Sequence, residues 1–132
     1  MLRVVLDTNI YISAILVGGK PEQIIDLARE GEIEVCISMP ILIEIERILK
    51  EKIGHTDEQV QHELLDIKSI TKFTNPKITL AVVEDDPDNR ILECAVQEKV
   101  DYLISGDTKH LQPLKEYEGI KIVSPAQFLS TL

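Results

Sequence analysis

Two kinds of apolar pattern alternate along the chain. Short runs rich in Val, Ile and Leu are typical of strands, whereas apolar residues that recur every three or four positions are typical of amphipathic helices. The short runs predict strands at residues 2–6, 34–37, 78–83, 101–105 and 120–123. Helical spacing predicts helices at residues 9–17, 21–30, 39–52, 56–69 and 86–99, and a last helix from residue 124. Residues 107–117 are predicted to form a turn or a short helix.

The order of these elements indicates the fold class. Strands alternate with helices over the whole length, which is typical of a mostly parallel sheet covered by helices on both faces. The sequence contains no internal repeat, low-complexity stretch or linker. It therefore predicts an α/β protein, a three-layer α/β/α sandwich formed as one domain by residues 1–132.

Residues typical of helix ends support these limits. Thr56 and Gln59 have the spacing of a capping box, in which each side chain bonds the backbone of the other. Pro21 suits the first position of a helix, and Gly31 suits the position after its end. Ser124, followed by proline, predicts the start of the last helix.

Length and composition exclude several classes of protein. A domain of 132 residues buries about two-thirds of its unfolded surface, so it needs no disulfide or metal merely to fold. Cys36 and Cys94 lie far apart and have no partner at zinc spacing, which favours buried free thiols. We find neither a signal peptide nor an apolar run long enough to span a membrane, and we expect a cytoplasmic protein.

The net charge of −9 argues at first sight against nucleic-acid binding, because phosphate backbones attract Lys and Arg. The argument fails if several acids gather around bound cations, which would reverse the local charge. The acidity also fits a role in solubility or in binding a basic protein partner.

Acidic residues follow several of the predicted strands. Asp7 follows residues 2–6, a group of acids from Glu84 to Asp88 follows residues 78–83, and Asp107 follows residues 101–105. The carboxyl ends of parallel strands meet at one edge of the sheet, where α/β proteins bind ligands. Glu44 is a further candidate, because it interrupts an apolar helix near its start.

Each of these acids also has a purely structural explanation, since Asp and Glu are common at helix starts and turns. These alternatives are a helix cap for Asp7 and Asp86, an interaction with the helix dipole for Asp88, a turn for Asp107 and a solvated helix face for Glu44. If the acids do converge, they cannot all stay ionised without a cation. Hard oxygen ligands suit Mg²⁺ or Mn²⁺, which activate water for phosphodiester hydrolysis.

The sequence resembles the PIN-domain nucleases, in particular the VapC-like toxin components of toxin–antitoxin systems. The resemblance rests on four motifs in order, which lie in the segments VVLDTNIYISAIL, SMPILIEIERIL and DPDNRILECAVQEKVDYLISGD. It implies that Asp7, Glu44, Asp88 and Asp107 hold Mg²⁺ or Mn²⁺ while water attacks a phosphodiester of RNA. It also implies a homodimer and an antitoxin partner.

The resemblance assigns supporting positions to Thr8, Asn9, Ser105 and, beside Asp88, Asn89, whose polar side chains would line the site. Relatives often carry an additional acid between the proline and the asparagine of the third motif, where this chain has only Asp88. Asp85 and Asp86 therefore remain alternatives to Asp88 as the third acid. Lys109 and His110 follow the fourth acid, where they would either meet phosphate or lie on the surface.

Three competing functions deserve comparison with a metal-dependent ribonuclease. A catalytically silent PIN-like module that binds RNA or protein is disfavoured, because all four matched acids are present. A phosphorylated receiver domain is disfavoured because Asp7 has no acidic neighbour and residues 34–37 do not end in an acid. A dinucleotide-binding enzyme lacks its glycine-rich phosphate loop here. For the homodimer, the apolar residues Ile24, Ile25 and Leu27 are candidates, with a role in the core as the alternative.

Overall fold

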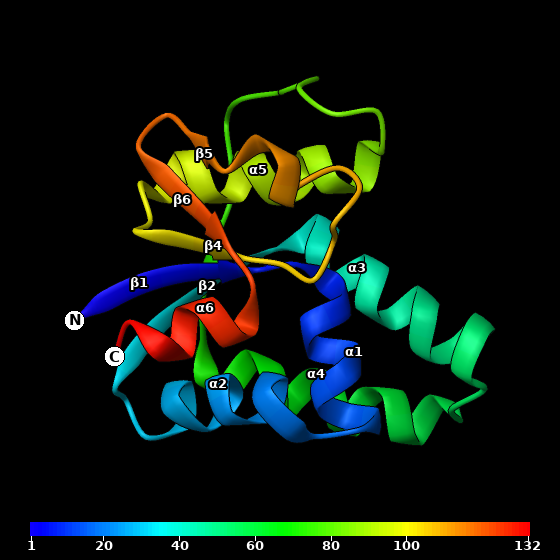
Figure 1. The fold of residues 1–132 in the computed structure, drawn as a ribbon. Helices are drawn as coiled ribbons and strands as arrows, with labels where there is room; N and C mark the ends of the chain where they lie inside the picture. Colours follow the sequence, from blue (N-terminus) through cyan, green and yellow to red (C-terminus); the bar gives the residue numbers. More distant parts are fainter.

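The computed structural model describes residues 1–132, which form a six-stranded sheet with the order β3-β2-β1-β4-β6-β5 (Figure 1). All neighbouring strands are parallel except β5 and β6. The strands are β1 (Leu2–Leu6), β2 (Ile33–Ser38), β3 (Thr71–Thr74), β4 (Tyr102–Ile104), β5 (Glu116–Tyr117) and β6 (Ile120–Val123). The helices are α1 (Thr8–Leu16), α2 (Gly19–Arg29), α3 (Met39–Arg47), α4 (Asp57–Ile70), α5 (Asp86–Glu98) and α6 (Pro125–Ser130), with a π-helical segment η1 (Ile48–Ile53) and a 3₁₀ turn η2 (Gln112–Leu114).

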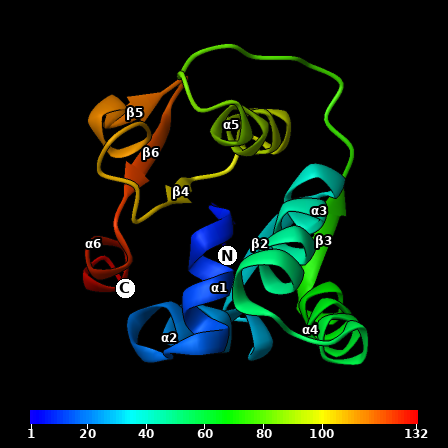
Figure 2. The same cartoon turned by 90° about the vertical axis from the view of Figure 1, so that its right-hand side faces the viewer.

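The helices lie on both faces of the sheet. Figures 1 and 2 show α5 on one face and α1, α2, α4 and α6 on the other, with α3 beside the end of β2. This arrangement confirms the predicted three-layer α/β/α sandwich with a mostly parallel sheet. No helix is both long and apolar enough to cross a membrane.

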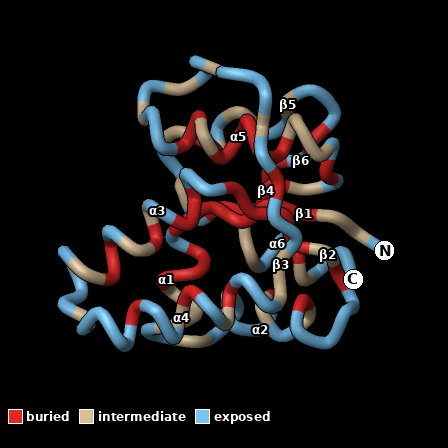
Figure 3. The backbone as a smooth tube through the Cα atoms, turned by 180° about the vertical axis from the view of Figure 1, so that it is seen from behind, coloured by how far each residue is buried: buried red, intermediate tan, exposed pale blue.

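The central strand β1 holds the middle of the core. Val5 lies between Cys36 of β2 and Leu103 of β4, and all three residues are completely buried. Figure 3 shows this continuous buried region along the sheet, with the exposed positions on the outer helices and loops. Such a core follows from parallel strands that are covered on both faces and are therefore apolar along their length.

Several predicted boundaries are confirmed. Thr56 and Gln59 form a complete capping box at the start of α4, and Ser124 forms another with Gln127 at the start of α6. Both cysteines are free and buried. Ile24 is fully buried, and Ile25 and Leu27 of the same helix are partly buried against the core, so all three residues contribute to packing within the chain.

The strand predicted at residues 78–83 is wrong. The third strand is instead Thr71–Thr74, directly after α4, and residues 78–83 belong to a long loop over α5 (Figure 2). The backbone N–H groups that a strand would donate to a neighbouring strand are donated here to side chains of α5. Leu80 N–H donates to Glu93 Oε2 at 2.8 Å, and Val82 and Val83 N–H both donate to Asn89 Oδ1. Only Leu80 and Val83 of this segment pack against the core, and the other four residues are exposed, so its β-branched composition gives strand propensity without a neighbouring strand to pair with.

We expect Leu103→Ala to destabilise the protein strongly, because Leu103 is 0% exposed at the centre of the sheet. The loss of its side chain would leave a cavity and lower the free energy of unfolding by about 2–5 kcal/mol. The matched control is Leu65→Ala, since Leu65 on α4 is 67% exposed and its truncation should change stability by less than about 0.5 kcal/mol. Urea denaturation measures both values, and equal effects would contradict this description of the core.

Candidate acidic active site

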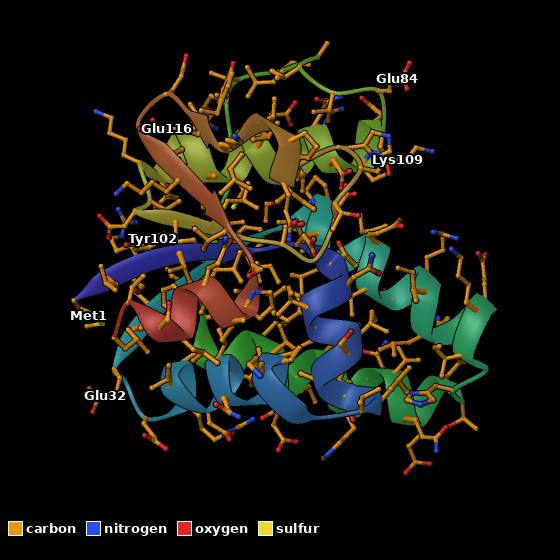
Figure 4. The ribbon with its side chains drawn as sticks, viewed as in Figure 1. Met1, Glu32, Glu84, Tyr102, Lys109 and Glu116 are labelled. Carbon is orange, nitrogen blue, oxygen red and sulfur yellow. The ribbon has the colours of Figure 1, made fainter.

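An open cleft of about 680 Å³ lies at the carboxyl end of the central strands. All four acids expected from the sequence line it, together with Thr8 and Asn9. Figure 4 shows Lys109, on the loop after β4, beside the first turn of α5. The charged residues that line the cleft are Asp7, Glu44, Arg47, Lys52, Asp85, Asp88, Asp107, Lys109 and His110.

Asp7 is fixed at the point where β1 passes into α1. Its backbone N–H donates to Ile104 O at 3.0 Å, which continues the pairing of β1 with β4. One carboxylate oxygen caps α1 by accepting from Ile10 N–H at 3.1 Å, and the other accepts from the Ser105 hydroxyl. Helix capping and membership of the acidic cleft, alternatives in the sequence, are therefore both true of Asp7. Burial raises its pKa, against the lowering effect of these hydrogen bonds.

Ser105 joins Asp7 to Asp107. Its hydroxyl donates to Asp7 and accepts from Asp107 N–H at 2.9 Å. The Asp107 carboxylate in turn accepts from Lys109 N–H at 2.8 Å and His110 N–H at 3.1 Å. Burial opposes ionisation of Asp107, but a hydrogen bond with Asp88 and these two backbone donors outweigh it and lower its pKa.

Asp88 comes from the first turn of α5 and not from a strand end. It is 9% exposed, and its buried Oδ2 atom has no hydrogen-bond partner. Burial, the hydrogen bond with Asp107 and the charges of Asp85, Asp107 and Asp7 raise the pKa of Asp88 to about 8. This carboxyl group therefore holds a proton at neutral pH when no cation is present.

The surroundings of Asp88 fit a divalent cation. His110 Nδ1 lies 3.7 Å from Asp88 Oδ2 and 3.5 Å from Asp107 Oδ2. Asp85, Asp88 and His110 each offer a ligand atom, and these atoms lie within 4.8 Å of one another. An unpartnered buried carboxylate oxygen among other oxygen donors is the arrangement that Mg²⁺ or Mn²⁺ would satisfy. Of the two positions left open for His110, the structure supports the one inside the cleft.

Glu44 lies in the same cleft but is bound differently. Its two carboxylate oxygens accept hydrogen bonds from Arg47, at 2.7 Å from Nη2 and 3.1 Å from Nε. These bonds lower the pKa of Glu44 below its usual value, against the effect of partial burial. Glu44 is thus the one predicted acid of the cleft whose charge is already balanced by a cationic side chain.

Two of the expected supporting residues do not line the cleft. Asn89 faces the loop over α5, where its amide bonds the backbone of Val82 and Val83. Ser105 is fully buried and acts through the two acids it joins. The expectation that Asn89 would line the site is therefore wrong, because its hydrogen bonds hold the loop instead.

The structure also separates the two alternatives to Asp88. Asp85 lines the cleft, whereas the side chain of Asp86 is 72% exposed and pairs with Arg90 outside it. Asp86 was expected to cap α5, but it is the first residue of the helix and Asp85 holds the cap position.

Sequence reasoning missed the basic residues Arg47 and Lys52 as cleft residues, although the spacing from Glu44 places Arg47 on the same helix face.

Comparison with known proteins identifies several similar ones. A protein-family model described as PIN domain matches residues 3–109. An uncharacterised protein of Methanocaldococcus jannaschii is 30% identical over 127 residues, which cover 92% of this chain and 81% of that protein. A chain of the crystal structure of VapBC2 from Rickettsia felis, bound to a DNA fragment from their promoter, has a TM-score of 0.65 at 17% identity. This match covers 93% of the present chain and 98% of the other, and it supports the fold.

We expect the metal-free protein to lose stability as the pH rises from about 4 to about 8. The folded state binds the Asp88 proton up to about pH 8, whereas an unfolded Asp releases it near 3.8, so protonation favours folding across this window. Asp88→Asn should remove part of this fall. The decrease in the free energy of unfolding between pH 5 and pH 8 should be about 1–3 kcal/mol smaller in the variant than in the wild type. Urea denaturation at both pH values, with EDTA present, measures the difference.

The control for this experiment is Asp66→Asn. Asp66 pairs with Arg29 outside the cleft, and that hydrogen bond lowers its pKa. Its replacement should not reduce the loss of stability between pH 5 and pH 8. An unchanged pH dependence in Asp88→Asn would contradict the assignment of the proton to Asp88.

Proposed function

The chain belongs to the PIN-domain family, and on this premise we propose that it is a divalent-metal-dependent ribonuclease. The observation that carries the proposal is the buried, unpartnered oxygen of Asp88, which lies among the other acids of an open cleft. A buried carboxylate without a partner is costly, and such groups gather at functional sites. The ligands of Mg²⁺ or Mn²⁺ in this proposal are Asp7, Asp88 and Asp107, with Glu44, Asp85 and His110 within the same cleft.

The bound ion would lower the pKa of a coordinated water and stabilise negative charge on the phosphoryl group. The protein's part is to hold its acids in place before RNA arrives. Ser105 fixes Asp7 relative to Asp107, and the backbone N–H groups of Lys109 and His110 fix Asp107. Preorganised groups of this kind need no rearrangement during the reaction.

Asp88 holds the proton that must leave before its carboxylate can bind a cation. A raised pKa makes metal binding dependent on pH, since protons and cations compete for the same oxygen. Raising the pH towards 8 therefore favours the charged, metal-binding form of this side chain. The hydroxyl of Thr8 and the amide of Asn9 line the cleft and are available to place water or phosphate.

RNA as the substrate is supported by the family resemblance and by the charges around the cleft. Arg47 and Lys52 come from α3 and η1, whereas Lys109 and His110 come from the loop after β4. These side chains provide positive charge for phosphates in a protein whose net charge is −9. Hydrolysis of an RNA phosphodiester by water is the reaction that this arrangement supports best.

A role as the toxin of a toxin–antitoxin pair is a further part of the proposal. It is supported by the fold shared with a chain of VapBC2 from Rickettsia felis. The corresponding expectations are a cytoplasmic protein that forms a homodimer and binds an antitoxin. The alternative, a catalytically silent module that binds RNA or protein, is disfavoured by the presence of Asp7, Glu44, Asp88 and Asp107 in the cleft.

We expect the protein to cleave a labelled single-stranded RNA in the presence of Mn²⁺ and to stop when EDTA is added. Asp7→Asn should lower the rate by about 100-fold or more, because it removes a charge from the proposed metal site while nearly keeping the shape. The rate is measured by gel electrophoresis of the end-labelled RNA, and circular dichroism verifies that the variant is folded.

The control is Asp66→Asn, which removes an equivalent charge outside the cleft and should leave the rate unchanged. Equal cleavage by the wild type and Asp7→Asn would show a contaminating nuclease. Binding of RNA without cleavage at any Mn²⁺ concentration would instead favour the silent module.

A further inference from the structure

Arg47 and Glu44 form an ion pair with each other in the cleft. In the proposed reaction the two side chains have different partners, since a carboxylate binds the cation and a guanidinium binds phosphate. The guanidinium of Arg47 bonds both oxygens of Glu44 and also lies 3.3 Å from Glu51. Arg47 and Glu44 both line the acidic cleft, and their side chains are 41% and 24% exposed. The pair is therefore open to solvent and can be exchanged for other partners.

The other acids of the cleft are held in a different way. Asp7 and Asp107 are bonded by a hydroxyl and by backbone N–H groups, which bind an acid without neutralising its charge. Only Glu44 among the four expected metal ligands is paired with arginine. A Glu side chain on a helix can also rotate about three bonds, whereas Asp7 is fixed as the cap of α1.

Arg47 is also the cleft cation best suited to a phosphate. Its planar guanidinium can bind two oxygens at once, as it does with Glu44. Lys52 and Lys109, which line the same cleft, form no ion pair, so their charges are available without any exchange. While the pair is intact the Glu44 charge offsets that of Arg47, so Arg47 offers its full charge to RNA only when Glu44 moves away.

We propose that Arg47 binds an RNA phosphate and that Glu44 controls this binding by exchanging partners. In the metal-free state Glu44 binds Arg47; when a divalent cation occupies the cleft, Glu44 turns to the cation and Arg47 turns to the phosphate. This inference rests on the proposed function of the cleft. Because both ligands compete with the same ion pair, each one strengthens the binding of the other.

The exchange predicts that Arg47 weakens metal binding in the absence of RNA. Arg47→Gln should free Glu44 and tighten Mn²⁺ binding by about threefold or more, as measured by the electron paramagnetic resonance of free Mn²⁺. Removing any positive charge near the cleft should also tighten Mn²⁺ binding to some extent, because that charge repels the cation. Lys52→Gln measures that general effect, because Lys52 lines the cleft without an ion pair, and it should give a clearly smaller change.

A double-mutant cycle tests whether the effect passes through Glu44. In a Glu44→Gln background the carboxylate is absent, so Arg47→Gln should no longer tighten Mn²⁺ binding beyond the change given by Lys52→Gln. A through-space effect of the Arg47 charge would persist in this background. The cycle therefore separates partner exchange from simple repulsion between Arg47 and the cation.

Binding of an RNA phosphate by Arg47 is tested by fluorescence anisotropy. The affinity for a short fluorescein-labelled single-stranded RNA is measured with and without Ca²⁺ as the divalent cation. Ca²⁺ should strengthen RNA binding by the wild type, and Arg47→Gln should lose most of this enhancement. Lys52→Gln should weaken RNA binding to a similar degree with and without Ca²⁺, since its charge is available in both states.

The outcomes distinguish this inference from the proposed function. If Mn²⁺ binds the wild type and Arg47→Gln matches Lys52→Gln, or if its effect persists without Glu44, the exchange is overturned while the metal site stands. An equal Ca²⁺ enhancement of RNA binding in the wild type and Arg47→Gln, or no RNA binding by the wild type, overturns the phosphate contact. Failure of the wild type to bind Mn²⁺ overturns the proposed function as well.

Discussion

The hydroxyl of Ser105 is the link on which the acidic cleft depends. The parallel pairing of β1 with β4 brings the ends of these strands together, and the Ser105 hydroxyl then joins the carboxylate of Asp7 to the backbone of Asp107. Two acids that lie 100 positions apart in the sequence are thereby held in one cleft. The same strands also carry the core residues Leu6 and Leu103, so the packing that stabilises the sheet positions the acids.

This arrangement places like charges where they repel one another. The protein reduces the cost by protonating Asp88, whose pKa is raised to about 8, and by pairing Glu44 with Arg47. Both adjustments also reduce the negative charge available to a cation. In the proposed account a divalent ion displaces a proton from Asp88 and frees Glu44 from Arg47, which would couple occupation of the cleft to pH and to substrate binding.

The central strands and the acids at their ends could be predicted because the signals are local. A buried run ends in Asp7, another precedes Asp107, and each pattern fits within about ten residues. Asp88 lines the cleft, as the resemblance implies, but no strand end carries it, because residues 78–83 form a loop that donates its N–H groups to Asn89 and Glu93. The loop has the local pattern of a strand, whereas the edge strand β3 (Thr71–Thr74) is paired through β2, a contact that local spacing does not specify.

The remaining features depend on contacts that spacing does not specify. The unpartnered oxygen of Asp88 and the position of His110 beside it are products of the folded chain. The most direct test of the account is diffraction from crystals soaked in Mn²⁺, recorded where manganese scatters anomalously. We predict an anomalous peak about 2.0–2.3 Å from carboxylate oxygens of Asp7, Asp88 or Asp107. A peak only outside the cleft, or no peak in well-ordered crystals at neutral to alkaline pH, would contradict it.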